Sequence, residues 1–528
     1  MTCLNKVAMA PPSSDHKRPH TPSSFCFSSL NLVWFLLVPS TVFFLVSTLA
    51  PHRPSISPLS SLLQVSFSNN SLQLQGSSIF NGSSIDSSFQ LEAETDYFVS
   101  NMPFPDAIIE KHTIQLDMSK NNESKPVVDV TLKIVKKNSK LERNEANLAR
   151  VRSSIKQAAL VRNLTSTHQD PDYVPHGPIY RNANAFHIYL EMEKVFKIYV
   201  YKEGEPPIFH NGPCRSIYSS EGRFIHELEK GNFYTTKDPD EALVYFLPFS
   251  VVMLVHYLYE PETSNTDAIG RTVVDYIDVI SGKYPYWNRS LGADHFMLSC
   301  HDWGPRTSSY VPHLFHKSIR VLCNANTSEG FNPSKDASFP EINLLTGEVE
   351  GLLGGPSPSH RSILAFFAGR LHGYIRYLLL NEWKDKRDPD VQVFDQLPKE
   401  VSYMSKLKNS RFCLCPSGYE VASPRIVEAI YAECVPVLIS DSYVPPFSDV
   451  LNWKSFSIQV AVKDIPNIKE ILMGVSQRQY LRMQRRVKQV QRHFVVNATP
   501  KRYDVFHMIN HSIWLRRLNI HIRDFHQS

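Results

Sequence analysis

The sequence carries little net charge for its length. Its 528 residues include 56 Lys and Arg against 51 Asp and Glu, a net charge of +5. Such a mild bias affects solubility and association rather than fold, and it gives no indication of nucleic-acid binding. The chain is 42% hydrophobic and 20% charged. That composition is typical of a folded globular protein, and the length suffices for two or three core-forming units.

Charged residues are absent from one long stretch near the N-terminus. No Asp, Glu, Lys or Arg occurs between Phe25 and Ala50, and at about 1.5 Å per helical residue this run can cross a hydrocarbon layer of about 30 Å. Lysine and arginine are more frequent before the run than shortly after it. By the positive-inside rule we expect a cytosolic tail over 1–24, a transmembrane signal-anchor over 25–50 and a lumenal remainder.

A cleaved signal peptide is the alternative interpretation of this run. Thr48 and Ala50 are small residues at the spacing of a cleavage site. The long polar lead, the length of the apolar run and Pro51 after the scissile bond argue against cleavage. We therefore expect a single-pass membrane protein.

Cysteines are few, and most lie in the body of the chain. Six of the eight follow the apolar run, an even number that favours disulfides in an oxidising compartment, although their spacing does not define the pairing. Sequons for N-glycosylation point to the same compartment. The predicted acceptors are Asn69, Asn81, Asn122, Asn163, Asn288, Asn326, Asn497 and Asn510.

Residues 51–176 are predicted to form a stem. The first part is rich in Ser, Asn and Pro and has little apolar periodicity, so it cannot bury enough surface to fold tightly. One amphipathic helix is expected at about 140–162, where Leu148, Val151 and Ile155 recur at helical spacing. This helix could pair with itself or dock on the body of the protein.

From residue 177 onward, short apolar runs alternate with helical periodicity. This alternation predicts an α/β fold with doubly wound parallel sheets. We expect a Rossmann-like N-terminal domain over 177–350, and a C-terminal domain with closing helices over 351–528 that faces it across a cleft. The expected strands are 196–201, 242–249 and 295–300 in the first domain, and 362–369, 410–415, 435–440 and 455–460 in the second.

The densest group of candidate site residues follows the expected strand at 410–415. A Pro-Ser-Gly turn containing Gly418 leads to a helix with Ser423 as its N-cap. A helix N-terminus at the carboxyl end of a strand is where open α/β sheets bind phosphate. Arg425 adds a positive charge there, and Glu428 could accept hydrogen bonds from a ribose diol. Alternatively, Arg425 and Glu428 form an i, i+3 ion pair on a surface helix.

A second junction of strand, glycine and helix follows the expected strand at 362–369. Gly369 would allow a backbone to approach a ligand closely. Arg370 or Arg376 could neutralise a diphosphate. This junction therefore adds three candidates for the same anion site.

In the first domain, candidate residues lie at both ends of one strand. Asp294 and His295 begin it, and His301 and Asp302 follow its carboxyl end, which would face the cleft. Either His301 or Asp302 could act as a general base. The alternative is that these side chains only cap the strand by hydrogen bonds to the backbone.

No metal site is predicted. The two histidines around this strand do not have the spacing of a closed zinc site. Asp238-Pro-Asp240 and Asp388-Pro-Asp390 look like metal-binding Asp-x-Asp sequences, but both lie in turn-like contexts.

Several segments together resemble the exostosin family, glycosyltransferase family 47, in its plant branch. The similarity extends over about 177–515. It implies a type II Golgi membrane protein with a GT-B fold. Such a protein transfers a sugar from a nucleotide sugar, expected to be a UDP-sugar, to a polysaccharide with inversion at the anomeric centre. The similar segments are 179–182, 191–193, 294–304, 335–340 and 412–441.

The resemblance also suggests roles for individual residues. Arg425 and Glu428 match donor-binding positions, and Gly418 and Ser423 would shape the loop around the donor. Members of the family generally need no metal at the donor site. In one departure, Glu433 stands where the family has glycine before a cysteine. A left-handed helix end costs glutamate about 1 kcal/mol more than glycine, so we expect an altered helix exit or lower local stability.

We therefore expect an inverting glycosyltransferase that acts on a cell-wall or extracellular polysaccharide. Its expected partners are a nucleotide sugar, a polysaccharide and a membrane, and oligomers with other glycosyltransferases are compatible with this interpretation. A catalytically silent lectin-like or scaffold subunit is the main alternative. A secreted hydrolase would need a pair of acids flanking its substrate, and no such pair stands out.

Overall fold

The computed structural model describes residues 139–161, 178–181, 185–261 and 263–523. The predicted tail, signal-anchor and most of the stem lie outside these residues, as do Asn69, Asn81, Asn122 and Asn163. None of the helices within the described ranges combines the length and apolar character that a membrane span requires.

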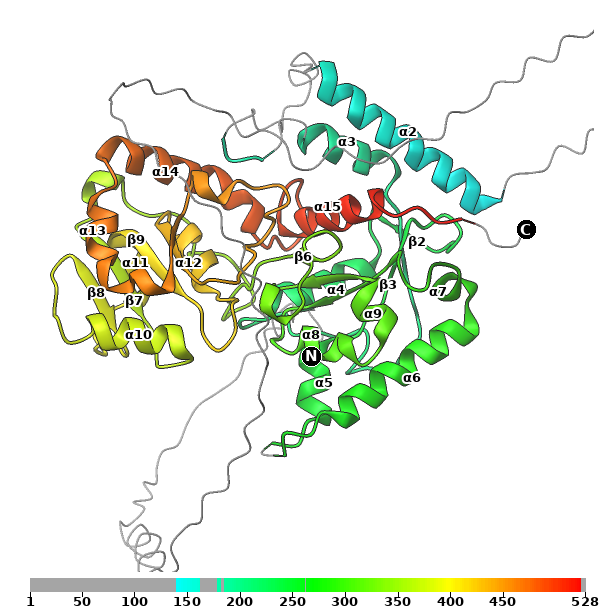
Figure 1. The fold of residues 1–528 in the computed structure, drawn as a ribbon, viewed down its shortest axis with the longest axis horizontal. Coiled ribbons are helices and arrows are strands. Elements are labelled where there is room, and N and C mark those ends of the chain that lie inside the picture. Colours follow the sequence, from blue (N-terminus) through cyan, green and yellow to red (C-terminus); the bar gives the residue numbers. More distant parts are fainter. Residues whose placement is uncertain (1–138, 162–177, 182–184, 262, 524–528) are drawn as a thin grey trace, which may run out of the picture. The chain divides into compact units, whose positions relative to one another are not determined.

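The first sheet has six parallel strands in the order β2-β1-β3-β4-β5-β6 (Figure 1). Its long central strands are buried, as expected where helices cover both faces. The strands are β1 Ile198–Val200, β2 Thr235–Thr236, β3 Val244–Phe246, β4 His295–Ser299, β5 Ile319–Leu322 and β6 Ala337–Ser338. The helices of this half are α3 Ala185–Val195, α4 Ser219–Lys230, α5 Val251–Leu258, α6 Asp267–Lys283, α7 Pro285–Ser290, α8 Gly304–Ser309 and α9 Pro312–His316, with a 3-10 turn at Thr327–Glu329.

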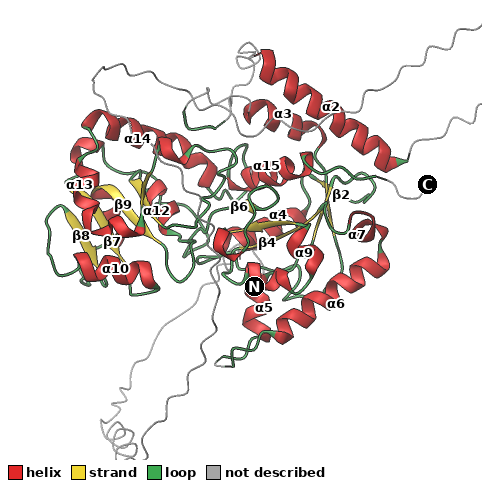
Figure 2. Cartoon of the chain, viewed as in Figure 1, coloured by secondary structure: helices red, strands yellow, loops and turns green. Residues whose placement is uncertain are grey.

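The second sheet has five parallel strands in the order β11-β10-β9-β7-β8, again flanked by helices (Figure 2). Two parallel sheets confirm the predicted α/β class. The strands are β7 Ile363–Ala368, β8 Val391–Phe394, β9 Ser410–Pro416, β10 Val435–Ile439 and β11 Ile458–Val460. The helices are α10 Tyr374–Trp383, α11 Tyr403–Asn409, α12 Arg425–Tyr431, α13 Ile468–Met473 and α14 Gln477–Val490, with 3-10 turns at Pro358–His360, Trp453–Ser455, Val462–Asn467 and Gln491–Phe494.

Strand β5 was not predicted from the sequence, because it contains Arg320. This residue stands in the middle of the strand, where a charged side chain breaks the apolar pattern. In the structure its guanidinium is completely buried and donates to the Asp336 carboxylate, with Nη2 2.6 Å from Oδ2. A buried charge is tolerated when it is paired and hydrogen-bonded in this way.

The helix predicted at 140–162 forms as α2, Lys140–Val161. Of the two alternatives for it, the structure shows docking on the body. Leu148 and Val151 are buried in the main core, and the Arg152 Nε donates to the Leu518 carbonyl at 2.7 Å. This part of the predicted stem therefore belongs to the folded body, where α2 contacts α3.

The last helix, α15 (Val505–Leu518), does not follow chain order. Its position in the sequence assigned it to the second domain, but it packs on β5 and β6 of the first sheet. Arg517 Nε donates to the Leu243 carbonyl at 2.7 Å. Arg516 donates to the Asp336 carbonyl of the first half and pairs with Asp449, which follows the second sheet's β10. The C-terminal helix thus joins both halves.

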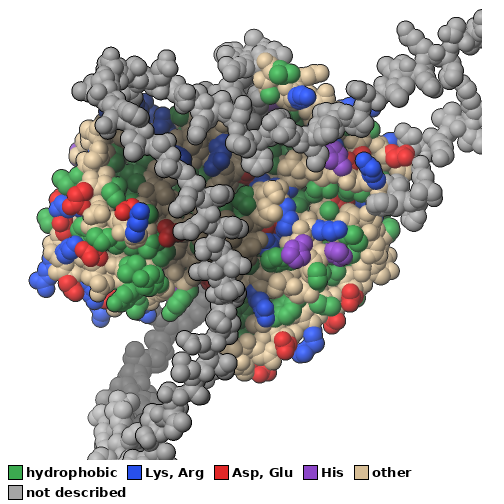
Figure 3. Space-filling view, in the orientation of Figure 1, with side chains coloured by type: hydrophobic (Ala, Val, Ile, Leu, Met, Phe, Trp, Pro, Cys, Tyr) green, Lys and Arg blue, Asp and Glu red, His purple; other side chains and the backbone are tan. Residues whose placement is uncertain are grey.

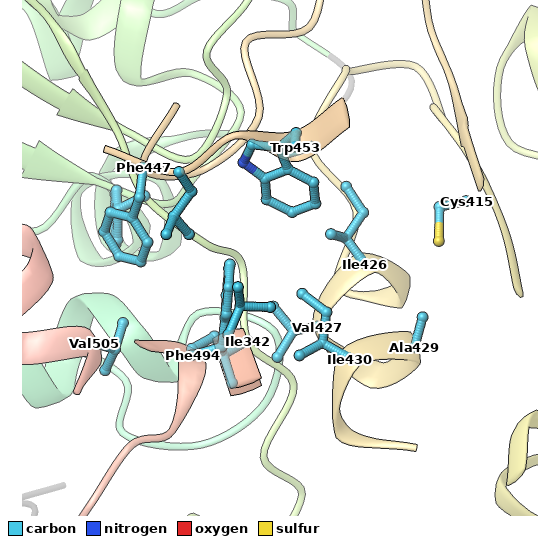
Figure 4. Packing of buried hydrophobic residues seen from close by; sticks show 14 of the residues in the cluster. Ile342, Cys415, Ile426, Val427, Ala429, Ile430, Phe447, Trp453, Phe494 and Val505 are labelled. Carbon is cyan, nitrogen blue, oxygen red and sulfur yellow. The ribbon is translucent and has the colours of Figure 1, made fainter. Parts of the chain in front are cut away.

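The main hydrophobic core extends across both halves. Figure 4 shows part of it, where Val427 and Ile430 of α12 lie near Ile342 and Phe494 from other segments. Because residues before and after the second sheet contribute to one core, the two halves pack as a continuous unit over these segments.

Two disulfides fix strand ends. Cys300 joins Cys323, which ties the carboxyl end of β4 to that of β5. Cys413 of β9 joins Cys434 just before β10. Cys415 remains a buried thiol. These pairings were not deducible from the sequence, because they depend on which strands become neighbours.

The described sequons differ in accessibility. Asn288 is exposed on α7, and Asn497 is half-buried. The Asn326 side chain is 7% exposed and its Nδ2 donates to Glu329 Oε1 at 2.8 Å, so a glycan there would require this turn to open. Asn510 is completely buried in α15. The structure argues against the predicted acceptor at Asn510, because a glycan there would require α15 to leave the core.

The exit of helix α12 keeps its left-handed geometry in spite of Glu433. This residue has φ 55°, and the Cys434 N–H donates to the Ala429 carbonyl at 2.9 Å, as in a glycine-ended helix. The carboxylate accepts a 3.4 Å hydrogen bond from Gln484 and lies 3.2 Å from the Lys488 Nζ. The expected altered exit is not seen, and the conformational cost is retained.

We predict that Glu433→Gly raises the free energy of unfolding by about 0.5–1 kcal/mol, because glycine adopts this φ without steric cost. Urea unfolding of the purified chain measures the change. Glu433→Ala is the matched control, since it loses the same side-chain contacts but keeps the strained Cβ, and it should not stabilise. Equal stabilisation by both variants would contradict this account of the helix exit.

Candidate active site

The carboxyl ends of the two sheets meet at a pocket of about 210 Å³. The site thus lies where open α/β sheets bind ligands. Four of the residues singled out in the sequence come together there, namely Asp302, Arg376, Gly418 and Arg425. The lining residues are Ile217, Asp302 and Glu341 from the first half, and His372, Arg376, Gly418, Glu420, Ala422, Pro424 and Arg425 from the second.

Arg376 brings an unpaired charge into this pocket. Its side chain projects from the first turn of α10 and is only 8% exposed. Within the described residues its guanidinium forms no hydrogen bond or ion pair, and its Nε is buried without a partner. Burial, reinforced by the nearby charge of Arg425, lowers the pKa of Arg376 to about 10. A buried cation of this kind calls for an anionic ligand.

Arg425 is the second cation of the pocket. It begins helix α12, and its Nη2 donates to the Ala368 carbonyl at 3.2 Å. The guanidinium lies over the Phe367 ring, 5.2 Å from its centroid, and Nε has no partner. Contacts with β7 therefore orient the side chain and leave donors free for a ligand.

The glycines predicted to line the site make room for side chains. A Cβ on Gly369 would lie 2.2 Å from the Arg425 Nη2, so the space above Gly369 is filled by that guanidinium rather than by a ligand. A Cβ on Gly418 would lie 2.7 Å from His372 Cδ2 and 3.3 Å from Arg376 Nη2. Both glycines are thus required by close packing around the two arginines.

Asp302 is an acid of the first half that lines the same pocket as the two arginines. It follows β4, whose end is fixed by the Cys300 disulfide and by Glu221, which accepts the Cys300 N–H at 2.7 Å. Burial, with a contribution from the negative charge of Glu329, raises the pKa of Asp302 to about 6. Asp302 is therefore mainly ionised at neutral pH yet basic enough to accept a proton.

His301 is less suited to the role of base. Its Nδ1 accepts the Trp303 N–H at 3.0 Å, and its ring stacks on Tyr218 with centroids 5.6 Å apart. Burial lowers the pKa of His301 to about 4, and its side chain is not among those that line the pocket. Of the two predicted candidates, the geometry favours Asp302.

Three further predictions have a different outcome. Arg370 is exposed and is not one of the pocket residues. Ser423 is not a side-chain N-cap: Pro424 occupies the cap position, and the buried Ser423 hydroxyl has no partner. Glu428 lies outside the pocket lining, and its carboxylate accepts the Tyr403 hydroxyl at 2.8 Å. The alternative pairing of Glu428 with Arg425 is not formed in the described structure either.

Three pocket residues were not predicted from the sequence, namely Glu341, Glu420 and His372. Glu341 lies three residues after the end of β6, so a strand end was the available signal, but β6 has two residues and leaves no periodicity to detect. Glu420 accepts a hydrogen bond from the Nδ2 of Asn324, a residue of the first half, at 2.9 Å. Burial, with help from Glu329, raises the pKa of Glu420 to about 7.

The other acidic candidates have structural partners. Asp238 and Asp240 hold Lys140 of α2 at 2.8 and 3.5 Å. The Asp388-Pro-Asp390 turn holds the Lys469 Nζ at 2.8 and 2.9 Å. Both Asp-x-Asp sequences therefore form ion pairs with lysines, and none of these residues lines the pocket.

Asp294 and His295 are buried structural groups. The Asp294 Oδ1 lies 2.9 Å from the His295 Nδ1, and the His295 Nε2 lies 2.8 Å from the Tyr201 hydroxyl. For this end of the strand, the structural interpretation is the better one.

A model of the exostosin GT47 domain matches residues 192–475, which is more than half of the chain and includes the entire pocket. The chain belongs to the exostosin family. A probable glycosyltransferase of Arabidopsis thaliana is 59% identical over 417 residues, which cover 78% of this chain and 80% of the relative. A second from the same plant is 59% identical over 382 residues, 71% and 81% of the two chains.

More distant members include a probable glucuronosyltransferase of Oryza sativa subsp. japonica, 27% identical over 309 residues, which cover 54% of this chain and 73% of the relative. A solved structure entitled "Crystal Structure of TarM" aligns over 38% of this chain and 51% of its own, at 10% identity and a TM-score of 0.22, too weak a likeness to inform the fold. This exostosin-family protein is thus a glycosyltransferase, and its pocket is the candidate active site.

We predict that Gly369→Ala displaces the Arg425 guanidinium, because the new Cβ would overlap it. Binding of inorganic pyrophosphate to the purified glycosyltransferase, measured by calorimetry, should weaken at least tenfold. The control is Gly282→Ala, where a Cβ meets nothing within 4 Å. Equal affinities for Gly369→Ala and the unmodified chain would show that Arg425 does not need this space.

Proposed function

We propose that this glycosyltransferase uses a UDP-sugar as donor and transfers the sugar to a polysaccharide with inversion of the anomeric centre. The observation that carries the proposal is a pair of arginines, the buried Arg376 and the half-buried Arg425, each with a partnerless Nε, in the pocket that Asp302 also lines. In this proposal the two arginines form the anion site and Asp302 is the base.

The two arginines suit the diphosphate of a nucleotide sugar. An uncompensated buried cation costs several kcal/mol, and a bound anion recovers this cost. Negative charge on the diphosphate increases as the bond to the sugar breaks, so fixed guanidinium groups stabilise the transition state more than the ground state. They supply the charge neutralisation that a metal ion would otherwise provide, and we propose that transfer is metal-independent.

Asp302 is proposed to activate the acceptor. Its carboxylate takes the proton of an acceptor hydroxyl while that oxygen forms a bond to the anomeric carbon, and the bond from this carbon to the diphosphate oxygen breaks. A single displacement of this kind inverts the configuration. One base and one anion site suffice for it, and Asp302 and the two arginines that line the pocket are proposed to supply them.

Exposed tyrosines near the pocket residues His372, Arg376 and Gly418 in the sequence offer a surface for sugars. Tyr374, Tyr377 and Tyr419 are 69%, 49% and 76% exposed, and the Tyr419 ring lies 4.4 Å from that of His372, which lines the pocket. Figure 3 shows hydrophobic side chains gathered over α10, which carries the first two. Exposed aromatic faces suit contact with the apolar faces of sugar rings. We propose a cell-wall or extracellular polysaccharide as acceptor.

Cellular location and fold type complete the proposal. The uncharged run at 25–50 would anchor a type II protein in the Golgi membrane, with the active site in the lumen. Two parallel sheets that face each other across the pocket support a GT-B architecture. A relative described as a probable glucuronoxylan glucuronosyltransferase, 25% identical over 384 residues, is in keeping with a cell-wall acceptor.

We predict that Arg376→Ala and Arg425→Ala each weaken UDP binding about 10- to 100-fold, since a hydrogen bond to a charged group contributes about 1.5–3 kcal/mol. Calorimetric titration of the purified chain with UDP measures this. Arg370→Ala is the matched control: its exposed side chain lies outside the pocket, and its effect should stay below about threefold. Near-normal affinity in both pocket variants would overturn the donor assignment.

A separate prediction concerns the base. Asp302→Asn should lower kcat by about 10²–10⁴ without weakening UDP binding. In the unmodified enzyme kcat/KM should fall tenfold per pH unit below about 6, because the Asp302 carboxyl becomes protonated there. His301→Gln should keep this acidic limb. If His301→Gln removes the limb and Asp302→Asn retains it, His301 is the base instead.

A further inference from the structure

Glu341 is a buried acid that the proposed transfer does not use. The segment around it is firmly held, because Ser220 Oγ donates to the Pro340 carbonyl at 2.9 Å and Ser219 Oγ donates to the Ile342 carbonyl at 2.6 Å. The carboxyl itself lines the pocket, is 8% exposed, and forms no hydrogen bond or ion pair with the described residues. A held backbone and an unpartnered buried side chain indicate a group positioned for a ligand.

The groups around Glu341 come from both halves and carry both signs. Burial is the main reason that the pKa of Glu341 rises to about 8, and the negative charges of Asp302 and Glu428 add to it, while Arg376 and Arg425 act in the opposite direction. At pH 7 the carboxyl is therefore mostly protonated. The titratable groups that face it are Asp302, Tyr218, Arg376, Arg425, Glu428 and Tyr443, and His372 and Glu420 share the same pocket.

A neutral carboxyl beside the two arginines has a clear chemical use. It still has one O–H to donate, whereas an ionised one only accepts. Neither arginine lies within ion-pair distance of Glu341, so space is left between these groups for a ligand rather than for a salt bridge. An apolar site that keeps a carboxylic acid neutral lets it donate a hydrogen bond to an oxyanion.

We propose that Glu341 binds the donor diphosphate as a neutral hydrogen-bond donor, so that nucleotide binding requires its proton. This inference rests on the proposed function, in which Arg376 and Arg425 hold the same diphosphate. Glu341 then binds the ligand in its protonated form, whereas Asp302, which lines the same pocket, acts in its ionised form.

The sign of the pH dependence follows directly. Below pH 8 the free enzyme holds the proton on Glu341 and donates it to the ligand. Above pH 8 the proton is lost, and the resulting carboxylate repels the diphosphate. The affinity should therefore fall as pH rises, by up to tenfold per pH unit above about 8.

The test is calorimetric titration of the full chain with UDP between pH 7 and pH 9. Over this range UDP keeps a constant phosphate charge, because the second phosphate pKa is about 6. For the unmodified chain we expect the Kd to rise several-fold from pH 8 to pH 9. Glu341→Gln keeps a neutral donor, so its Kd should not rise, and at pH 9 it should bind UDP several-fold more tightly than the unmodified chain.

Two further variants separate a specific effect from a structural one. Glu341→Ala lacks the donor and should bind UDP more weakly than Glu341→Gln at pH 7, with thermal melting as a check that both variants fold. Glu348→Gln makes the same substitution at a carboxylate that pairs with Arg223 outside the pocket, and it should keep the alkaline loss of affinity.

Each outcome decides between the possibilities. An affinity that is flat from pH 7 to pH 9 in the unmodified chain, or an alkaline loss that persists in Glu341→Gln, overturns the inference and leaves the proposed function intact. Absence of UDP binding to the unmodified chain at pH 7 overturns the proposed donor, and the role of Glu341 with it.

Discussion

The active-site pocket depends on how the two sheets are held together. The chain after β10 forms backbone hydrogen bonds to the first half: the Val444 N–H donates to the Ala325 carbonyl at 3.0 Å and the Phe447 N–H to the Ser338 carbonyl at 2.9 Å. These bonds connect the carboxyl ends of strands from both sheets. Because these hydrogen bonds join the backbones of the two halves, they help to hold Asp302 of the first half and Arg425 of the second at the same pocket.

Comparison of the buried arginines separates structural from functional charges. Arg320 and Arg517 are almost completely buried, and each guanidinium donates to a carboxylate and to carbonyl oxygens. Arg376 is nearly as buried, yet it has no partner in the described structure. The chain can satisfy a buried arginine where stability requires it. The lack of a partner for Arg376 therefore supports an anionic substrate more strongly than its position in the sequence does.

The sequence predicted those site residues that stand at the ends of long, strongly apolar strands. Asp302 follows β4 and Arg425 follows β9, and both strands are evident from composition. Glu341 escaped prediction because a two-residue strand has no pattern. The role of Gly369 could not be inferred either, since it depends on where the side chain of Arg425, 56 residues further along, comes to lie. The burial of Asn510 likewise depends on the docking of α15, which tertiary contacts decide.

Three carboxylates near the pocket show that environment, rather than residue type, decides their roles. Glu428 is held by the Tyr403 hydroxyl outside the pocket lining, and so it is not free to bind a ribose in this conformation. Asp302 is partly exposed, which leaves it ionised at neutral pH. Glu341 is more deeply buried and stays protonated. Their environments push the pKa values of these two acids apart. At one pH, Asp302 can therefore act as the base while Glu341 donates a hydrogen bond to the leaving group of the same displacement.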